Sequence, residues 1–577
     1  MNEPIWYKSW PDELPKSLKP YPEIPIFKFL EESARQYPDR TAIKFMGKTY
    51  TFQEIYDDAQ SLSASFSDMG IGKGDIVALL LPNTPQFVIS YYAILMTGAT
   101  VTMCSPLHSE REMIHQLNDS GSETLITINL KRLFKLVDKI KSKTKLKRII
   151  VSKFHTALPT LKGFLFKLFK RSEIAKIDWN REDIYSFEDL LDNENPPPNV
   201  IIKPKEDMAH LAYTGGTTGL PKGAVITHYN ATCNVLQTKY WIAPAFGHEI
   251  PDKLSIEKFP QEDNPITLVV VPWFHAMGTI AYLNFPICSA TTMIVLPRFE
   301  PVQWMEMLKK EDVEAVGGAP TLFIKILGHE KFPEYEKYFE SLKLIGSGAG
   351  PLAKEHLKKL NEISSGVVME AYGMTEVSMG CVYNPCTNDG VRKVGSVGIP
   401  FYDSYAKIVD LETGKKEMPI GEKGEVTMKG PQVMQGYWNK PKETEKVLRD
   451  GWMYSGDIGY MDEDGYIFLV DRKKDMIKHS GYNIYPRNLE EVLYEHPDVK
   501  EAAVIGIPDP EKIEIPKAYV VLKEGATVSK SELLDFVHQH VAKYEKIREL
   551  EFVDEVPMSE TGKILRRKLR EKEGINK

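Results

Sequence analysis

The run Tyr213-Thr-Gly-Gly-Thr-Thr-Gly-Leu-Pro-Lys-Gly223 holds the residue types of a phosphate-binding loop. Its glycines let the backbone turn several N–H groups toward one anion, and its threonines add hydroxyl donors. Lys222 adds a positive charge. The spacing does not fit the GxxxxGK[ST] pattern, which excludes a Walker-type loop. The run therefore predicts a phosphate-binding loop of another kind.

The elements that must position this loop belong to a chain of 577 residues, long enough for three or four folding units. Hydrophobic residues make up 42% and charged residues 27%, which excludes wholesale disorder. The net charge of −7 argues against a dedicated nucleic-acid binder. Five scattered cysteines without a CxxC pair, and no visible signal peptide, indicate reduced thiols and a cytoplasmic protein.

Helical and strand-like segments alternate in the first hundred residues. Thr51 and Glu54 form a capping box before a helix that ends near Gly70, Ile76–Leu81 is a buried strand, and residues 85–97 form a second helix. This alternation predicts parallel sheets covered by helices on both faces. Two long uncharged stretches, 76–108 and 264–297, are broken by prolines and polar residues, so we interpret them as core segments, not membrane spans.

The last hundred residues have a different pattern. We expect a helix over 487–496, strands over 502–507 and 517–522, and a helix capped by Ser529 and Glu532 that runs to about Val541. A strand over 551–553 and a basic, solvated tail that includes Arg566 follow. We predict two domains, residues 1–472 and 473–577.

Further motifs follow the loop in order. They are Pro272-Trp-Phe-His275, Gly317-Gly-Ala-Pro-Thr321, Ser347-Gly-Ala-Gly-Pro-Leu352, Tyr372-Gly-Met-Thr-Glu376, Gly424-Glu425 with Gly436-Tyr-Trp438, Tyr454-Ser-Gly-Asp457, Asp471–Lys478 with Ser480-Gly481, and Pro557–Lys563. The series resembles the adenylate-forming (AMP-binding) superfamily, and most of all its long-chain and medium-chain fatty acyl-CoA synthetases, over about residues 26–568. The resemblance implies an α/β fold. It would have a large N-terminal domain of doubly wound sheets plus a small barrel-like part, followed by a small mobile α+β domain.

The resemblance also implies the chemistry. ATP converts a carboxylic acid to an acyl-adenylate and releases pyrophosphate, and coenzyme A then displaces AMP to give a thioester. Thr217, Glu376 and Lys563 would be catalytic, with Glu376 holding Mg²⁺. The implied ATP-binding residues are Thr214, Gly215, Gly216, Thr217, Thr218, Gly219, Lys222, Gly348, Ala349, Gly350, Glu370, Ala371, Tyr372, Gly373, Met374, Thr375, Asp457, Arg472 and Lys563.

Two further groups come from the same resemblance. The acyl pocket would be lined by Trp273, His275, Gly317, Gly346 and Gly348. The coenzyme A site and the hinge between the domains would use Lys474, Lys478, Ser480 and Gly481. The chain departs from the family at Gly215, where serine is usual, at Ile513, where glycine is usual, and over Tyr544–Ile547.

The acid is the least determined feature. The segment 131–176 holds 15 Lys and Arg against 2 acidic residues, and within it 159–176 interleaves basic with apolar residues. Such a helix either packs as an ordinary surface helix or lies on the inner face of an anionic membrane. It favours a medium- or long-chain fatty acid, while a 4-hydroxybutyrate-type or aryl acid stays open. A membrane-associated fatty-acid uptake protein, an enzyme that passes its acyl group to a carrier or oxidises it, and a homodimer are further alternatives.

Overall fold

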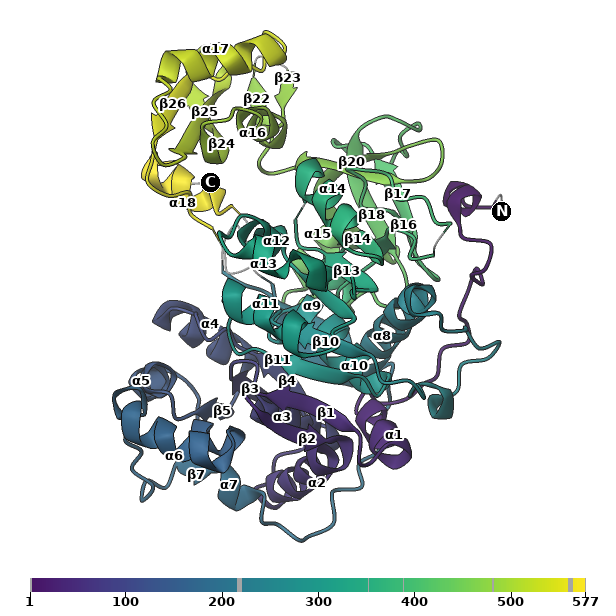
Figure 1. Ribbon diagram of the computed structural model, residues 1–577, viewed down its shortest axis with the longest axis vertical. Helices are drawn as coiled ribbons and strands as arrows, with labels where there is room; N and C mark the ends of the chain where they lie inside the picture. The colour runs from purple at the N-terminus through teal and green to yellow at the C-terminus, as the bar shows by residue number, and fades with distance from the viewer. Residues whose placement is uncertain are drawn as a thin grey trace.

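The computed structural model describes residues 3–214, 220–350, 352–387, 389–479, 482–558 and 564–575. Within these ranges four sheets are built (Figure 1). The first has the order β7-β6-β5-β3-β4-β8-β9 and is parallel except for the antiparallel β8–β9 edge. Its strands are β3 Ile76–Leu80, β4 Thr100–Met103, β5 Thr124–Ile128, β6 Arg148–Ser152, β7 Ile184–Ser186, β8 Met208–Tyr213 and β9 Gly223–Thr227.

The second sheet has the order β16-β15-β14-β13-β12-β10-β11-β1-β2, with a parallel centre and antiparallel edges. The predicted α/β class is confirmed, with mixed sheets in the large N-terminal part. The strands are β1 Thr41–Phe45, β2 Lys48–Thr51, β10 Ile266–Val269, β11 Thr292–Val295, β12 Ala315–Gly318, β13 Leu344–Ser347, β14 Val367–Tyr372, β15 Val382–Tyr383 and β16 Ile399–Pro400.

Helices cover these sheets and form two hydrophobic cores, a large one that includes both sheets and a smaller one against the second sheet. The predicted capping box is present, with the Glu54 amide donating to Thr51 Oγ1 and the Thr51 amide to Glu54 Oε2, and it begins α2 Phe52–Asp68. The next helix, α3 Pro85–Met96, is buried on all sides, as a helix inside a layered core must be. No helix among the described residues has the length and hydropathy to cross a membrane. Five free cysteines, Cys104, Cys233, Cys288, Cys381 and Cys386, are buried in the same region.

The basic segment 131–176 is an integral part of the first sheet and its covering helices. It contains the helix α5 Lys131–Ile140, the strand β6 between β7 and β5, and the helix α6 Thr160–Phe169. After Arg148 the four residues of β6, Ile149–Ser152, carry no charge and are all buried, as expected for a parallel strand covered on both faces. The cationic residues therefore belong to the surface of an integral part of the first sheet.

A third, antiparallel sheet occupies the place of the expected barrel-like part. Its strands are β17 Tyr405–Val409, β18 Gly424–Lys429, β19 Leu448–Arg449, β20 Trp452–Met461 and β21 Ile467–Arg472. The chain leaves this sheet at Arg472 and enters the fourth sheet at Ile477. The fourth sheet lies at one end of the molecule, apart from the first two sheets (Figure 1).

The fourth sheet and its helices form the C-terminal part. The strands are β22 Ile477–His479, β23 Tyr482–Ile484, β24 Val499–Asp509, β25 Ile513–Leu522 and β26 Glu549–Phe552, and the helices are α16 Pro486–Tyr494, α17 Lys530–His540 and α18 Arg566–Lys572. The predicted capping box of Ser529 and Glu532 begins α17. The basic tail is a helix, α18, that packs its Leu569 into a small core with β24 and β25.

Candidate functional site

The predicted phosphate loop connects β8 to β9. Its two ends pair directly, because the Thr214 amide donates to the Lys222 carbonyl at 2.9 Å. Most of the predicted phosphate-binding residues lie between these two ends and outside the described residues. They are Gly215, Gly216, Thr217, Thr218 and Gly219. Lys222 forms an ion pair with Glu443 at 2.6 Å, and its Nζ stands 5.0 Å from the centre of the Tyr437 ring.

Glu376 lies on the other side of Tyr437. It follows β14 in the 3-10 turn η9 Thr375–Val377, and the Tyr437 hydroxyl donates to its Oε1 at 2.6 Å. Burial raises the pKa of Glu376, and no described lysine or arginine forms an ion pair with it. Tyr437 thus links the phosphate-loop lysine to the carboxylate that we expect to hold the metal. The sequence marks Gly436–Trp438 as a motif but gives Tyr437 no role, because its partner is 61 residues away.

Tyr372, Asp457 and Arg472 form a second cluster close to the first. The Tyr372 hydroxyl donates to Asp457 Oδ2 at 2.7 Å, and Arg472 Nε lies 3.3 Å from Asp457 Oδ1. The pairing of β20 with β21 brings Asp457 directly opposite Arg472. Burial, followed by the Asp457 charge, raises the pKa of Tyr372, so this phenol stays a hydrogen-bond donor. All three residues are among those predicted from the sequence to bind ATP.

Small residues follow the carboxyl ends of the neighbouring parallel strands β12, β13 and β14. Gly318, Ser347 and Glu370 are register partners, so the residues after them meet at one edge, where open α/β sheets bind ligands. The Gly348 amide donates to the Gly318 carbonyl, and Ala349 holds a positive φ of 69°. Glu370 accepts from the Leu352 amide at 3.0 Å, and burial raises its pKa. The predicted Ala371 lies on β14 itself, Gly350 follows β13, and Gly373, Met374 and Thr375 follow β14.

Three of the predicted acyl-pocket residues, Trp273, Gly317 and Gly346, contact Tyr282, a residue that the sequence does not single out. The Tyr282 hydroxyl lies over Gly317 and Gly346. A Cβ added to Gly317 would be 1.6 Å from the hydroxyl oxygen, and a Cβ added to Gly346 would be 3.5 Å from it. Trp273 is fully buried and donates from Nε1 to the Tyr282 carbonyl at 2.7 Å. Trp273 therefore fixes the backbone of Tyr282. His275 caps the short helix α9 Ala276–Thr279 through its carbonyl, which accepts from Thr279.

The predicted hinge residue Lys474 lies in the turn between β21 and β22. Its side chain is exposed at the surface, yet the protein around it, followed by the Arg472 charge, lowers its pKa to about 8. Lys478 is exposed on β22, and its amide donates to Glu514 at 2.8 Å. The other two predicted residues of this group, Ser480 and Gly481, lie outside the described residues, as does Lys563.

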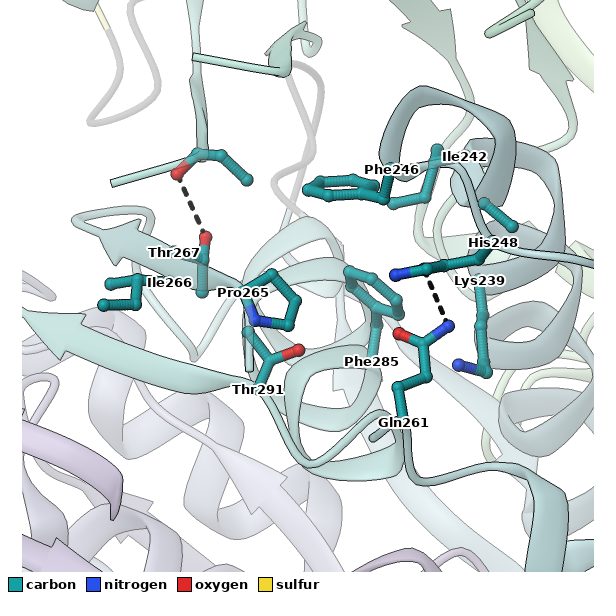
Figure 2. A pocket seen from close by; sticks show the side chains of 12 residues that line it. Lys239, Ile242, Phe246, His248, Gln261, Pro265, Ile266, Thr267, Phe285 and Thr291 are labelled. Carbon is teal, nitrogen blue, oxygen red and sulfur yellow. Dashed lines mark hydrogen bonds between the residues drawn. The ribbon is translucent and has the colours of Figure 1, made fainter. Parts of the chain in front are cut away.

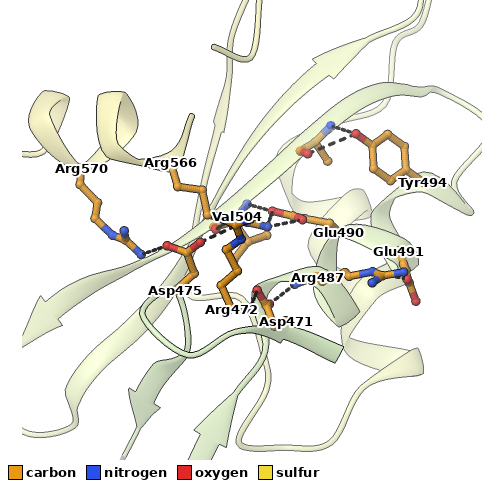
Figure 3. A network of polar contacts seen from close by, with 11 residues as sticks. Asp471, Arg472, Asp475, Arg487, Glu490, Glu491, Tyr494, Val504, Arg566 and Arg570 are labelled. Atoms are coloured by element: carbon orange, nitrogen blue, oxygen red, sulfur yellow. Dashed lines mark hydrogen bonds and ion pairs between the residues drawn. The ribbon is translucent and has the colours of Figure 1, made fainter. Parts of the chain in front are cut away.

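The Arg566 side chain is only 13% exposed, which corrects the expectation of a solvated tail. Its guanidinium binds both carboxylate oxygens of Glu490, at 2.6 and 2.8 Å, and donates to the Val504 carbonyl (Figure 3). Asp475, next to Lys474, lies 3.5 Å from Arg566 and 2.9 Å from Arg570. A buried arginine needs such carboxylates, and they lie far from it in sequence, so the run Arg566-Arg567-Lys568 did not reveal them.

This network also borders the segment that carries Lys563. Met558 and Ile564, on either side of residues 559–563, pair in an antiparallel bridge, and the Leu565 amide donates to the Pro557 carbonyl at 2.7 Å. Arg566 follows directly. The ends of the segment are therefore held at the start of α18, and α18 is held to the hinge turn by Asp475.

The chain matches known proteins over almost its full length. A family model described as AMP-binding enzyme matches residues 30–438, and one described as AMP-binding enzyme C-terminal domain matches residues 488–563. A long-chain-fatty-acid–CoA ligase of Bacillus subtilis is 39% identical over 578 residues, which covers 99% of this chain and 98% of that protein.

Solved structures agree with this relationship. ATP-bound MatB from Rhodopseudomonas palustris has a TM-score of 0.79 at 25% identity and covers 95% of this chain and 99% of its own. The o-succinylbenzoate coenzyme A synthetase MenE from Bacillus subtilis, in complex with ATP and magnesium ion, has a TM-score of 0.73 at 26% identity and covers 95% and 100%.

Proposed function

This chain belongs to the family of AMP-binding enzymes and is an AMP-forming acyl-CoA ligase, and from that premise we propose that its acid is a medium- or long-chain fatty acid. The enzyme would first join the carboxylate to the α-phosphate of ATP with release of pyrophosphate. The thiol of coenzyme A would then attack the acyl carbon and displace AMP. The name of the B. subtilis relative supports a long chain.

One observation carries the assignment of the nucleotide site. Five separate motifs supply the contacts that run from Lys222 through Tyr437 to Glu376 and the neighbouring cluster of Tyr372, Asp457 and Arg472. We assign the phosphates to the first and the ribose to the second. Aligned reactants and fixed charges are what this step needs, because an anionic carboxylate must approach an anionic phosphate.

The residues present fit one Mg²⁺ beside Glu376. A buried carboxylate without a cationic partner among the described residues is costly, and a divalent cation would offset that cost. Mg²⁺ keeps several waters and is commonly held by one or two carboxylates plus phosphate oxygens, so one glutamate suffices. When bound, it would neutralise charge on the nucleotide phosphates. The Tyr437 hydroxyl would hold the carboxylate in place, and Lys222 would add charge at the phosphate loop.

The test of the function is pyrophosphate release over a graded series of C2 to C18 acids, with and without coenzyme A. We expect release to be greatest with medium- or long-chain acids, and AMP and thioester to form only when coenzyme A is added. A maximum with 4-hydroxybutyrate or an aryl acid would replace the fatty acid. No release with any acid would contradict the proposal, and sustained turnover without coenzyme A would indicate transfer to another acceptor or oxidation.

We further propose that α6 lies on the inner face of an anionic membrane. Two contacts join α6 to the rest of the protein. Gly163 packs against the backbone of His155, and the ring centre of Phe166 lies 5.0 Å from that of Phe154. Its other apolar side chains are exposed, with Phe164 at 63% and Phe169 at 74%. They lie among exposed Lys167, Lys170 and Arg171, the composition of an interfacial helix. The remaining exposed apolar residues of α6 are Leu161, Leu165 and Leu168.

Vesicle binding tests this surface without removing the helix. We expect the native protein to sediment with phosphatidylglycerol vesicles and the double variant F164S/F169S to lose most of that binding, while both release pyrophosphate equally from a water-soluble acid. The control is Ile201→Ser, which changes an 82% exposed residue elsewhere. Equal sedimentation of the double variant would reject the membrane contact. A homodimer stays a prediction.

A further inference from the structure

Glu425 is a buried carboxylate to which the proposed site gives no role. It lies on β18 and belongs to the motif Gly424-Glu425, whose chemistry the sequence leaves open. The residue is 6% exposed, and its two carboxylate oxygens have different partners. The Gly456 amide donates to Oε1 at 3.0 Å, and Lys473 Nζ donates to Oε2 at 2.8 Å. A buried carboxylate needs such partners to compensate for the water it has lost, so both contacts hold it in place.

A bulge in β20 explains why the Gly456 amide needs a side-chain partner. The register of β18 against β20 shifts at this point, so that three residues of β20, 455–457, lie opposite Val426 alone. Gly456 has a φ of 72°, a conformation that glycine adopts readily, and its amide donates to Glu425 instead of to the neighbouring strand. Bulges re-aim the side chains next to them and are frequent beside active sites. Glu425 therefore fixes the turn that carries Asp457.

Both partners of Glu425 adjoin residues of the proposed ribose cluster. Gly456 precedes Asp457, and Lys473 follows Arg472. The two stretches are also joined to each other, because the Lys473 amide donates to the Gly456 carbonyl at 2.9 Å and β20 pairs Asp457 with Arg472. One carboxylate thus holds the neighbours of both residues, and with them the position of Asp457 relative to Arg472.

The Asp457 carboxylate has acceptor capacity left for a ribose. The Tyr372 hydroxyl donates to its Oδ2 at 2.7 Å, and Arg472 Nε lies 3.3 Å from its Oδ1. An ionised carboxylate offers about four acceptor positions, so each oxygen can accept from one further hydroxyl. Two hydroxyls of one ribose can donate to the carboxylate only if its position is held, because hydrogen bonds weaken steeply when they are bent.

Lys239 is another buried charged residue outside the proposed site, and its surroundings differ. It belongs to α8 His228–Ile242, and its Nζ donates to the Ser289 hydroxyl at 3.0 Å. Figure 2 shows it beside His248 and Gln261 at the edge of a cavity. No described residue that lines this cavity belongs to the proposed nucleotide or acyl site. Glu425, in contrast, contacts the neighbours of two residues of the ribose cluster.

We propose that Glu425 is a positioning residue that holds Asp457 and Arg472 in the arrangement that binds the two ribose hydroxyls of ATP. The inference rests on the proposed function, which assigns the ribose to this cluster. Glu425 acts through the Gly456 amide and the Lys473 ammonium, without contact to the nucleotide. Loss of its charge would release both neighbours and would weaken the part of ATP recognition that depends on the ribose hydroxyls.

The experiment compares kcat/KM for ATP and for 2′,3′-dideoxy-ATP, which lacks both ribose hydroxyls, in pyrophosphate release. We expect the native enzyme to prefer ATP at least about tenfold, because hydrogen bonds to a charged group are lost with the dideoxy nucleotide. Glu425→Gln keeps the size of the side chain and an acceptor for the Gly456 amide, but it removes the ion pair with Lys473. It should lower the preference for ATP by about threefold or more. The fall should come from kcat/KM for ATP, with the value for the dideoxy nucleotide within about twofold of that of the native enzyme.

Glu422→Gln is the matched control, because it makes the same change at an exposed position three residues earlier, and it should leave both values unchanged. A general defect in Glu425→Gln would lower kcat/KM for both nucleotides by the same factor, and this unchanged ratio would overturn the inference. If Glu425→Gln does not fold, Lys473→Met removes the ion pair from its other end and should lower the ratio by about twofold or more. An unchanged ratio there would overturn the inference as well.

The native enzyme separates a failure of this inference from a failure of the proposed function. Equal kcat/KM for the two nucleotides in the native enzyme would contradict the ribose assignment and overturn the inference with it. Absence of pyrophosphate release from every acid would contradict the proposed function itself. A native enzyme that prefers ATP, with the same ratio in Glu425→Gln, would overturn the role of Glu425 alone.

Discussion

At the scale of single residues, Tyr437 touches both the lysine of the phosphate loop and the carboxylate proposed to hold the metal. A hydrogen bond to a carboxylate stabilises its charged form, by about 1.5–3 kcal/mol. Tyr437→Phe removes this donor and should raise the pKa of Glu376 further above its already raised value. Only the ionised carboxylate attracts a cation. The acid limb of the pH profile of adenylation should therefore move to higher pH, with a loss of roughly tenfold at neutral pH.

The measurement is the pH dependence of kcat/KM for ATP at several magnesium concentrations. Tyr460→Phe, on β20 with its ring stacked on Phe468, is a suitable control because it changes the same atoms outside the site. If the acid limb of the pH profile has the same midpoint in Tyr437→Phe as in the native enzyme, the hydrogen bond from Tyr437 does not affect the pKa of Glu376.

Lys563 is expected to stabilise the transition state of adenylation only. Lys563→Ala should lose on the order of 10²-fold or more in pyrophosphate release, the effect of removing one donor from a developing charge. Thioester formation from supplied acyl-adenylate should continue. Lys568→Ala, at an exposed position of α18, should leave both half-reactions unchanged. Equal losses of both half-reactions in Lys563→Ala would mean that the role is misassigned.

The sequence predicted that some site residues lie close together, and the structure confirms this for Tyr372, Asp457 and Arg472. Each of these residues belongs to a short motif. Their motifs name them before any contact is known. Tyr437 and Tyr282 escape such reasoning, because a tyrosine is ordinary in composition and its role depends on a partner reached only through tertiary structure. The prediction for Arg566 was wrong for the same reason. A run of basic residues is typical of a solvated tail, and the carboxylate of Glu490 that binds Arg566 is reached only through the tertiary structure.

At the scale of elements, α18 is attached to the rest of the C-terminal domain by the buried pair of Arg566 and Glu490. Breaking a buried ion pair by removing one partner commonly costs about 3–5 kcal/mol, because the other charge stays buried. Arg566→Met should lower the free energy of unfolding of the C-terminal domain by this amount in urea. The double change R566M/E490L should recover part of it, because no unpaired charge is left.

The neighbouring arginine provides the control. Arg567 is exposed, and its ion pair among the described residues is with Glu571, one turn along α18. Arg567→Met should therefore change the unfolding free energy by less than about 0.5 kcal/mol. If Arg566→Met were equally harmless, the network in Figure 3 would not hold the helix.

Elements with caps and regular apolar spacing were predicted well. The helices that begin after Thr51 and Ser529 start where their capping boxes place them. The strand β6 within the segment 131–176 was not predicted. It has only five residues, and many basic residues surround its short apolar run. Net charge reports on the surface, whereas the position of a strand depends on a few apolar residues.

At the scale of the whole molecule, we propose that the C-terminal domain moves between the two half-reactions and that the turn after Arg472 absorbs the movement. Lys474→Pro fixes φ near −65° at this turn. No hydrogen bond to a described residue uses the Lys474 amide, so the substitution should not disturb the fold. We expect adenylation to be retained and thioester formation to be lost, as for a hinge closed by few dihedrals.

Single-turnover assays of each half-reaction distinguish this outcome from a general defect. Lys473→Pro is not an equivalent control, because the Lys473 amide donates to the Gly456 carbonyl. Lys474→Ala, which keeps the backbone free, is the matched comparison and should behave like the native enzyme. Unchanged overall turnover in Lys474→Pro would place the hinge elsewhere.

The buried cysteines have a practical consequence for assays of thioester formation by the folded enzyme. Burial raises the pKa of all five thiols, and a thiolate is the form that reacts with disulfide reagents. A colour-forming disulfide dye added to samples of the reaction would therefore titrate free coenzyme A and leave the folded polypeptide untouched. The fading of that colour with time would report product directly, with no need for radioactive acid or a coupling enzyme.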